Sequence, residues 1–372
     1  MFNVILRLIC FSVFHSLVSC NKSDLLKSQT ISLSKSEIVI NHGDLLLKNF
    51  SLLNKIVGED SLLIFDQGTN DLVLFDLENK RPLWSRTFEL DGPNFLDLPI
   101  LDAQVSADSI FLLSESYFSI FSTEGNILLR INLKKMKELN LDYRINQFQI
   151  LSTKKVLFSR IPSEAYFPTQ SSNIPASLFF IFNFDDLSIE ALPLFSPKEA
   201  LLSDRSRMFV GGHYQHFMNL KENTLVYNFK FLSTIYNYDL NNGKRELFLA
   251  NSSHTSNLRE AYAVAESSDS RNTAEYMLGG LIFSSVQFDQ KTNLYIRLHS
   301  ETFEKNNVTK RKTYLMVFDI NFETKLELEL TDKVGIEPIV QNGKIYLKKT
   351  GLPNIEGGYE FVVYTINDPL TK

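Results

Sequence analysis

The chain has 372 residues, of which 44% are hydrophobic and 22% are charged, and its formal net charge is −5. These values are typical of a folded globular protein, and a slightly acidic chain lacks the basic excess of nucleic-acid-binding proteins. The aromatic content is uneven, with 30 Phe and 14 Tyr against one Trp. Because aromatic residues favour half-buried strands, the composition predicts a β-rich fold with no nucleic-acid partner.

The N-terminus has the pattern of a bacterial lipoprotein signal. Residues 1–19 are largely apolar, and Leu17-Val18-Ser19 leads directly into Cys20. Secretory signals combine an apolar run of about 7–15 residues with a small-residue cleavage site. The run is shorter than the roughly 20 apolar residues that cross a bilayer. We therefore expect residues 1–19 to be removed as a signal peptide and Cys20 to receive a lipid.

Two features depart from this pattern: Arg7 lies late for a basic start, and His15 interrupts the apolar run. An ordinary cleaved signal with an incidental cysteine and a buried first element remain the alternatives. Cleavage would remove Cys10 and leave an acylated Cys20, so the mature chain would contain no disulfide and no cysteine metal site. The chain would then be anchored to a membrane through the lipid on Cys20.

The expected domain organisation follows from this signal. Residues 1–19 form the signal peptide, residues 20–30 form a lipidated tether, and residues 31–372 form one domain. Asn21 stands where an inner-membrane retention signal would have Asp. The sequence therefore favours lipid anchoring at the outer membrane of the cell envelope and leaves the periplasmic or surface face open.

Beyond the tether, one pair of strand patterns recurs about six times. The first pattern is a polar turn followed by a short apolar run, at 60–65, 108–113, 155–158, 223–227, 293–296 and 343–347. The second is an apolar run that ends in an Asp, Asn or Gly turn, at 72–76, 119–121, 180–182, 234–239, 315–319 and 361–364. Asx and Gly residues tolerate the left-handed conformations of tight hairpins. Because a further strand pattern follows these turns, each unit resembles a four-stranded meander.

The spacing of these units indicates a β-propeller. The units recur at roughly 46 to 80 residues, which matches or exceeds the roughly 40–50 residues of a propeller blade. We predict an all-β, six-bladed propeller, and a sandwich of unrelated hairpins is the alternative. A strand pattern at 30–40 precedes the first complete unit. We expect this N-terminal strand to join the last blade and close the ring.

Several segments in this order are similar to a known protein family. They are the lipobox at Cys20, Asp91-Gly92-Pro93, the strand 293–298, the segment 318–321 with 327–329, and the closing strand 360–364. The chain resembles an uncharacterised family of Gram-negative, six-bladed-propeller-like lipoproteins with a domain of unknown function. The resemblance implies a propeller lipoprotein, and it implies no activity or cofactor.

The histidines offer one weak candidate for a metal site. His213 and His216 stand three residues apart, with no carboxylate or third histidine at metal-ligand spacing nearby. In a strand their side chains would point to opposite faces, whereas a turn would bring them together. The alternative is an ordinary role at a blade edge. We therefore expect no cofactor.

The composition predicts ligand-binding or surface loops in two connections, at 162–176 and at the polar, Ser-rich segment 251–276. The segment 162–176 contains Tyr166, Phe167 and Pro168 among small polar residues. Binding sites commonly lie on loops over a rigid scaffold, and exposed aromatic rings hold a sugar or a peptide. The alternative is a surface loop without a ligand. Basic residues gather at one predicted hairpin tip and in one further connection, and we expect both to be solvated: Lys305, Lys310, Arg311 and Lys312, and Lys134, Lys135 and Lys137.

The sequence contains no recognisable catalytic set. Asp66, Asp76, Asp239 and Asp319 stand where turns require Asx residues, and no nucleophile elbow, phosphate loop or dinucleotide fingerprint is present. We therefore favour a non-catalytic, membrane-anchored propeller that binds an envelope protein or a glycan. One alternative is a glycan hydrolase or lyase that uses carboxylates in the propeller channel. The other is a structural subunit of an envelope complex.

Overall fold

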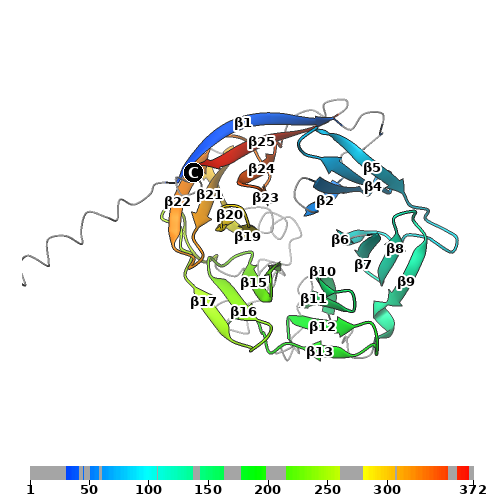
Figure 1. The fold of residues 1–372 in the computed structure, drawn as a ribbon. Coiled ribbons are helices and arrows are strands. Elements are labelled where there is room, and N and C mark those ends of the chain that lie inside the picture. Colours follow the sequence, from blue (N-terminus) through cyan, green and yellow to red (C-terminus); the bar gives the residue numbers. More distant parts are fainter. Residues whose placement is uncertain are drawn as a thin grey trace, which may run out of the picture.

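The computed structural model describes residues 31–41, 45, 51–57, 61–106, 108–136, 143–162, 177–197, 215–259, 280–305, 308–350 and 358–367. Within these residues the chain forms strands, apart from one short 3-10 turn, η1 (Leu133–Lys135). No helix in this part of the chain is long and apolar enough to cross a membrane. Six antiparallel sheets stand around a common axis (Figure 1), so the predicted all-β, six-bladed propeller is confirmed.

Each of the first three blades has four strands, which run from the axis outward in chain order. The first blade contains β2 (Ser51–Val57), β3 (Ser61–Asp66), β4 (Asp71–Asp76) and β5 (Arg81–Thr87). The second contains β6 (Ile100–Ser106), β7 (Ser109–Ser114), β8 (Tyr117–Ser122) and β9 (Ile127–Asn132). The third contains β10 (Tyr143–Ser152), β11 (Lys155–Pro162), β12 (Phe179–Asn183) and β13 (Ile189–Ala191).

The remaining blades repeat this meander with two variations. The fourth contains β14 (His216–Lys221), β15 (Thr224–Phe229), β16 (Ile235–Asp239) and β17 (Arg245–Phe248). The fifth has a divided inner strand and contains β18 (Ile282–Phe283), β19 (Gln287–Asp289), β20 (Leu294–Lys305), β21 (Val308–Phe318) and β22 (Thr324–Leu330). The sixth contains β23 (Ile339–Gln341), β24 (Lys344–Lys348), β25 (Gly358–Asn367) and, outermost, β1 (Ser32–Asn41).

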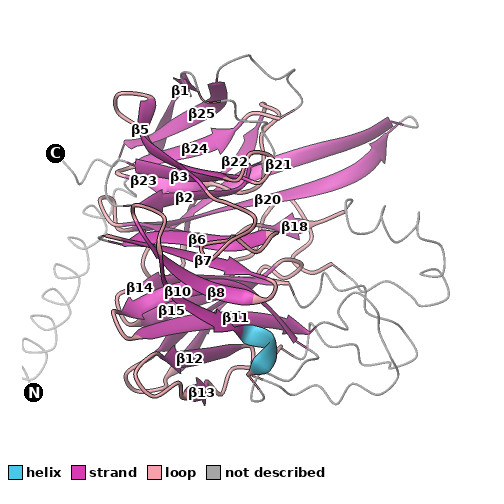
Figure 2. Ribbon diagram, turned by 90° about the vertical axis from the view of Figure 1, so that its right-hand side faces the viewer, coloured by secondary structure: helices cyan, strands magenta, loops and turns pink. Residues whose placement is uncertain are grey.

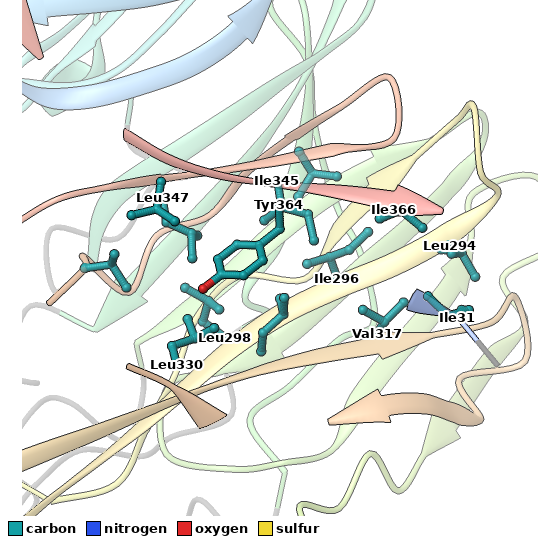
Figure 3. Packing of buried hydrophobic residues seen from close by; sticks show 14 residues of the cluster. Ile31, Leu294, Ile296, Leu298, Val317, Leu330, Ile345, Leu347, Tyr364 and Ile366 are labelled. Atoms are coloured by element: carbon teal, nitrogen blue, oxygen red, sulfur yellow. The ribbon is translucent and has the colours of Figure 1, made fainter. Parts of the chain in front are cut away.

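The N-terminal strand closes the ring, as the sequence predicts. β1 pairs antiparallel with β25 over ten residues, from Ser32 opposite Asn367 to Asn41 opposite Gly358. At its start, Ile31 packs with Leu294, Ile366 and other apolar residues of the fifth and sixth blades (Figure 3). Ile31, directly before β1, is therefore part of the core.

The second strand of most blades is a nearly uninterrupted apolar run because its two faces contact different neighbours. β3 and β7 are buried at five of their six positions. Apolar side chains on these faces form six clusters, and each cluster joins two adjacent blades. Between the second and third blades, the Phe118 ring lies 5.1 Å from the rings of both Phe148 and Phe158. Aromatic side chains thus form much of the apolar contact between neighbouring blades, which a single blade could not make alone.

Polar side chains near the axis also join neighbouring blades through backbone groups. Amides and carboxylates from inner or second strands, or from the turn directly after a second strand, bond to the peptide groups of the next blade. These contacts are Gln67 Nε2 to Ile100 O (3.0 Å), Phe148 N to Asp102 Oδ2 (3.0 Å), Met218 N to Gln147 Oε1 (3.2 Å), Asn228 Nδ2 to Ser284 O (2.8 Å) and Gly343 N to Asp289 Oδ1 (3.0 Å). Such bonds satisfy buried peptide groups and fix the angular register of the blades.

The turns confirm the expected role of the Asx residues. Backbone N–H groups two residues further along donate to the carboxylates of Asp66, Asp76, Asp239 and Asp319, at 2.7–2.9 Å. A carboxylate in such an Asx turn stabilises the change of chain direction. These four carboxylates therefore have a structural role.

The two faces of the ring differ in the connections that they carry. We call the end of the blades where first and second strands join, as at Glu222 and Asn223, the lower face. The upper face is the end where second and third strands join, as between β20 and β21. β1 begins at the lower face, because Ser32 lies opposite Asn367 and Ile366 N donates to Gly343 O (2.7 Å). The long β20–β21 hairpin projects in the opposite direction, from the upper face (Figure 2).

Candidate functional site

Most of the site residues predicted from the sequence lie outside the described residues. These are Cys20, the loop residues Tyr166, Phe167 and Pro168, and His213. Lipidation, the aromatic binding loop and the histidine pair therefore remain predictions. The strands that flank the loop segment, β11 and β12, are the second and third strands of their blade.

His216 is the one member of the predicted histidine pair that the structure describes. It opens β14, and its side chain is fully buried. Its ring lies 5.0 Å from the Phe179 ring and 5.7 Å from the Phe229 ring. No group of three or more His, Cys, Asp or Glu residues that could hold a metal ion occurs in the described part of the chain.

A charged cluster lies on the upper face and draws on three successive blades. Lys230 follows β15 in the fourth blade, and its Nζ donates to Gln215 Oε1 at 3.0 Å. Arg259 approaches from the link after the fourth blade, with its guanidinium 4.9 Å from the Phe231 ring. Arg311, in the β20–β21 hairpin, is also close enough to repel the Lys230 ammonium. Burial and this repulsion together lower the pKa of Lys230.

Glu337 provides a carboxyl group close to Lys230. It lies two residues before β23, the innermost strand of the sixth blade, and attracts the Lys230 ammonium. Its side chain is exposed to solvent, yet the surrounding protein raises the pKa of its carboxyl to about 7. At neutral pH this carboxyl is therefore only partly ionised.

The closeness of Arg259 depends on a glycine. Gly280 has a φ of +68°, and a Cβ at this position would lie 2.8 Å from Arg259 Cζ. A side chain at Gly280 would therefore displace the guanidinium and strain the backbone. The backbone N–H of Arg259 also donates to Phe231 O at 3.0 Å. The local backbone thus holds Arg259 beside the loop that carries Lys230.

A second polar network lies between the fourth and fifth blades, where the apolar cluster has only eight buried members. Arg297 in β20 is fully buried, and it donates to Ser233 O at 2.6 Å and to Ala250 O at 2.7 Å. Its guanidinium also lies 4.6 Å from the Phe283 ring. Burial lowers the pKa of Arg297 to about 9, so the side chain is still charged at neutral pH. The network therefore connects the two blades through a buried cation.

Neighbouring residues complete this network. His299 stacks on Tyr314 with ring centroids 4.9 Å apart, and His254 also stacks on Tyr314, with ring centroids 5.1 Å apart. Glu327 accepts hydrogen bonds from Ser252 Oγ (2.6 Å) and Ser253 N (2.9 Å), and lies 3.5 Å from His299 Nε2. Burial, reinforced by Arg297, lowers the pKa of His299 to about 3. A neutral histidine bordered by a carboxylate and two serines resembles a catalytic group, but the Ser252 hydroxyl donates to the carboxylate and not to the imidazole.

The strand order and its closure define the class of protein, a six-bladed β-propeller. A family model described as "Domain of unknown function (DUF4221)" matches residues 24–326, so the chain belongs to the DUF4221 family. The crystal structure of a DUF4221 member from Bacteroides vulgatus ATCC 8482 has a TM-score of 0.70 at 14% identity, and the match covers 92% of this chain and 100% of that one.

A second solved structure is also similar. It is a Bacteroides fragilis NCTC 9343 protein whose name marks it as expected to be exported, with a TM-score of 0.53 and 11% identity. The match covers 93% of this chain and 98% of that one. At these identities both likenesses show the fold alone. No curated protein matches the sequence.

Proposed function

We propose that this DUF4221 protein is a lipid-anchored binding protein of the cell envelope that takes an anionic ligand near the axis of its upper face. The observation that carries the proposal is the gathering of Arg259, Arg311 and Glu337 around Lys230. These side chains come from different blades, so the propeller fold itself assembles the cluster. Positive charge in a partly desolvated surface attracts carboxylate, sulfate or phosphate groups.

The position of β1 supports a particular orientation of this site. Cys20 lies eleven residues before Ile31, and a flexible tether of that length spans roughly 15–20 Å. Because β1 begins at the lower face, a lipid on Cys20 would hold that face against the membrane. The charged cluster would then face away from the membrane, toward soluble ligands. Expected export of the similar Bacteroides fragilis protein agrees with an envelope location.

The experiment is a binding titration of the full chain in detergent with acidic oligosaccharides, using oligomers of glucuronate and neutral glucose oligomers as a control. The glucuronate oligomer should bind and the glucose oligomer should not. Lys230→Met should weaken binding by about tenfold, since losing one partly buried charge contact costs on the order of 1–2 kcal/mol. Lys221→Met is the matched control, because Lys221 ends β14 at the lower face. Equal affinity in both variants would contradict the site.

The pH dependence offers a second test of the same site. As pH falls through about 7, Glu337 takes up a proton and the site becomes more positive, so anion binding should tighten between pH 8 and pH 6. Glu337→Gln should bind at pH 8 as tightly as the native chain does at pH 6. A native pH dependence that persists in Glu337→Gln would assign the titration to another group.

A catalytic role is the second candidate, and the raised pKa of Glu337 is the observation that favours it. A carboxyl with a pKa near 7 is suited to general acid catalysis, as in many glycosidases. Such enzymes need a second, ionised carboxylate across the bond that is broken. Release of shorter sugars from the glucuronate oligomer would support this candidate, and its loss in Glu337→Gln would assign the acid.

A further inference from the structure

The hairpin formed by β20 and β21 is longer than the sheet to which it belongs. The two strands pair along their full length, whereas β22 pairs with β21 only as far as Thr313 and β18 pairs with β20 only as far as Ser300. The remaining residues, 301–305 and 308–312, project past the neighbouring sheets on the upper face (Figure 2). We call this projecting part the ribbon.

The outer edge of the ribbon is the side of Val308–Lys312 that faces away from β20. On the inner edge, Thr302 N donates to Gly280 O at 3.1 Å, so that side is partly occupied. Within the described residues, no strand pairs with the outer edge. Alternate residues of an antiparallel strand turn their N–H and C=O groups toward each edge. The outer edge therefore presents main-chain donors and acceptors that an added strand could pair with.

Three side chains of this edge are basic and exposed. Lys310, Arg311 and Lys312 are consecutive, so positive charge occurs on both faces of the strand. Lys312 already forms an ion pair with Glu329 at 3.2 Å, which shows that a carboxylate is accommodated beside this edge. Two copies of the edge would place like charges opposite each other, which disfavours pairing with a second copy of this chain.

We propose that the outer edge of the ribbon, Val308–Lys312, accepts an extended acidic segment of a partner polypeptide as an added β-strand. The open edge supplies main-chain hydrogen bonds, and the basic side chains select for Asp or Glu. An anionic polysaccharide or lipid headgroup would satisfy the charges, but it lacks the peptide groups that the edge can bind. The proposal relies on the proposed function only for the location of the partner in the envelope.

The experiment uses the full chain in detergent and a fluorescent octapeptide of alternating Glu and Val, with binding measured by anisotropy. The peptide should bind, and the same peptide N-methylated at both its Glu and its Val residues should not. Lys310→Glu/Lys312→Glu should weaken binding by about tenfold or more, because like charges would then face each other. That variant should instead bind an octapeptide of alternating Lys and Val. Lys134→Glu/Lys135→Glu, with the same change of charge at an exposed site on η1, should bind like the native chain.

Several results would overturn the proposal. They are absence of peptide binding to the native chain, equal binding of the N-methylated peptide, and equal weakening in the two double variants. Equal binding of the N-methylated peptide would identify a basic surface that binds polyanions in general, without strand addition. Lys230→Met separates this proposal from the charged cluster around Lys230. The variant should leave octapeptide binding unchanged, even if that cluster binds no acidic sugar. Weakened octapeptide binding in Lys230→Met would place the peptide at the axis and contradict the ribbon site.

Discussion

Replacement of Arg297 by Met should destabilise the fold strongly, because Arg297 joins the fourth and fifth blades from a fully buried position. The guanidinium satisfies the carbonyl groups of Ser233 and Ala250, both on buried residues. Met has a similar length and remains compatible with the Phe283 ring, but it has no donor. Each buried carbonyl left without a donor costs about 1–3 kcal/mol. After a partial offset from removing a buried charge, the net loss should be about 2–5 kcal/mol.

The assay is urea denaturation, with the free energy of unfolding taken from the midpoint at unchanged slope. Arg144→Met is the matched control, because Arg144 pairs with Glu115 at 2.8 Å while both side chains remain exposed. An exposed ion pair of this kind contributes about 0–1 kcal/mol. If Arg297→Met lost less than about 1 kcal/mol, or no more than Arg144→Met, the two carbonyl bonds would not connect the blades as argued.

Two further predictions concern the same blade junction and the ring closure. Unfolded His299 would protonate near pH 6.5 but folded His299 only near pH 3, so acidification across this interval should destabilise the native chain more than His299→Gln. Parallel urea titrations at pH 7 and pH 4 check this, and equal losses in both proteins would contradict it. Ile40→Ala in β1 should cost about 2–4 kcal/mol, because Ile40 is fully buried. Val39→Ala, at an exposed position of the same strand, should cost under about 0.5 kcal/mol, and equal losses would contradict the closure by β1.

The parts of the fold that sequence predicts well are those with local causes. Short apolar runs and Asx turns recur along the chain, and the carboxylates of Asp76 and Asp239 do bond to backbone N–H groups within their own turns. The strand pattern at 30–40 precedes the first complete four-stranded unit and belongs to none. It is therefore predicted to close the ring, and β1 does pair with β25. The repeated strand and turn patterns thus predict the topology without information on contacts between distant residues.

The polar networks could not be predicted because their partners are distant in the chain. Arg297 donates to backbone carbonyls 64 and 47 residues away. Every residue has a backbone carbonyl, so the sequence does not show which ones accept these bonds. His254 and His299 were isolated in sequence, yet both stack on Tyr314. A charged residue inside an apolar strand was the one available signal for Arg297. Glu337 and Lys230 offered none, because they meet only when the ring closes.

If the chain is tethered at its lower face and binds from its upper face, as proposed, the two faces lie at different distances from the membrane, and a depth measurement distinguishes them. Single cysteines would replace Lys344, at the lower face beside the start of β24, or Lys310, on the ribbon. After reconstitution of the lipidated protein, a fluorophore on each cysteine would be exposed to a quencher carried on lipid headgroups. With the lower face against the membrane, strong quenching is expected at position 344 and little at position 310. The reverse order, or equal quenching at both positions, would contradict this orientation.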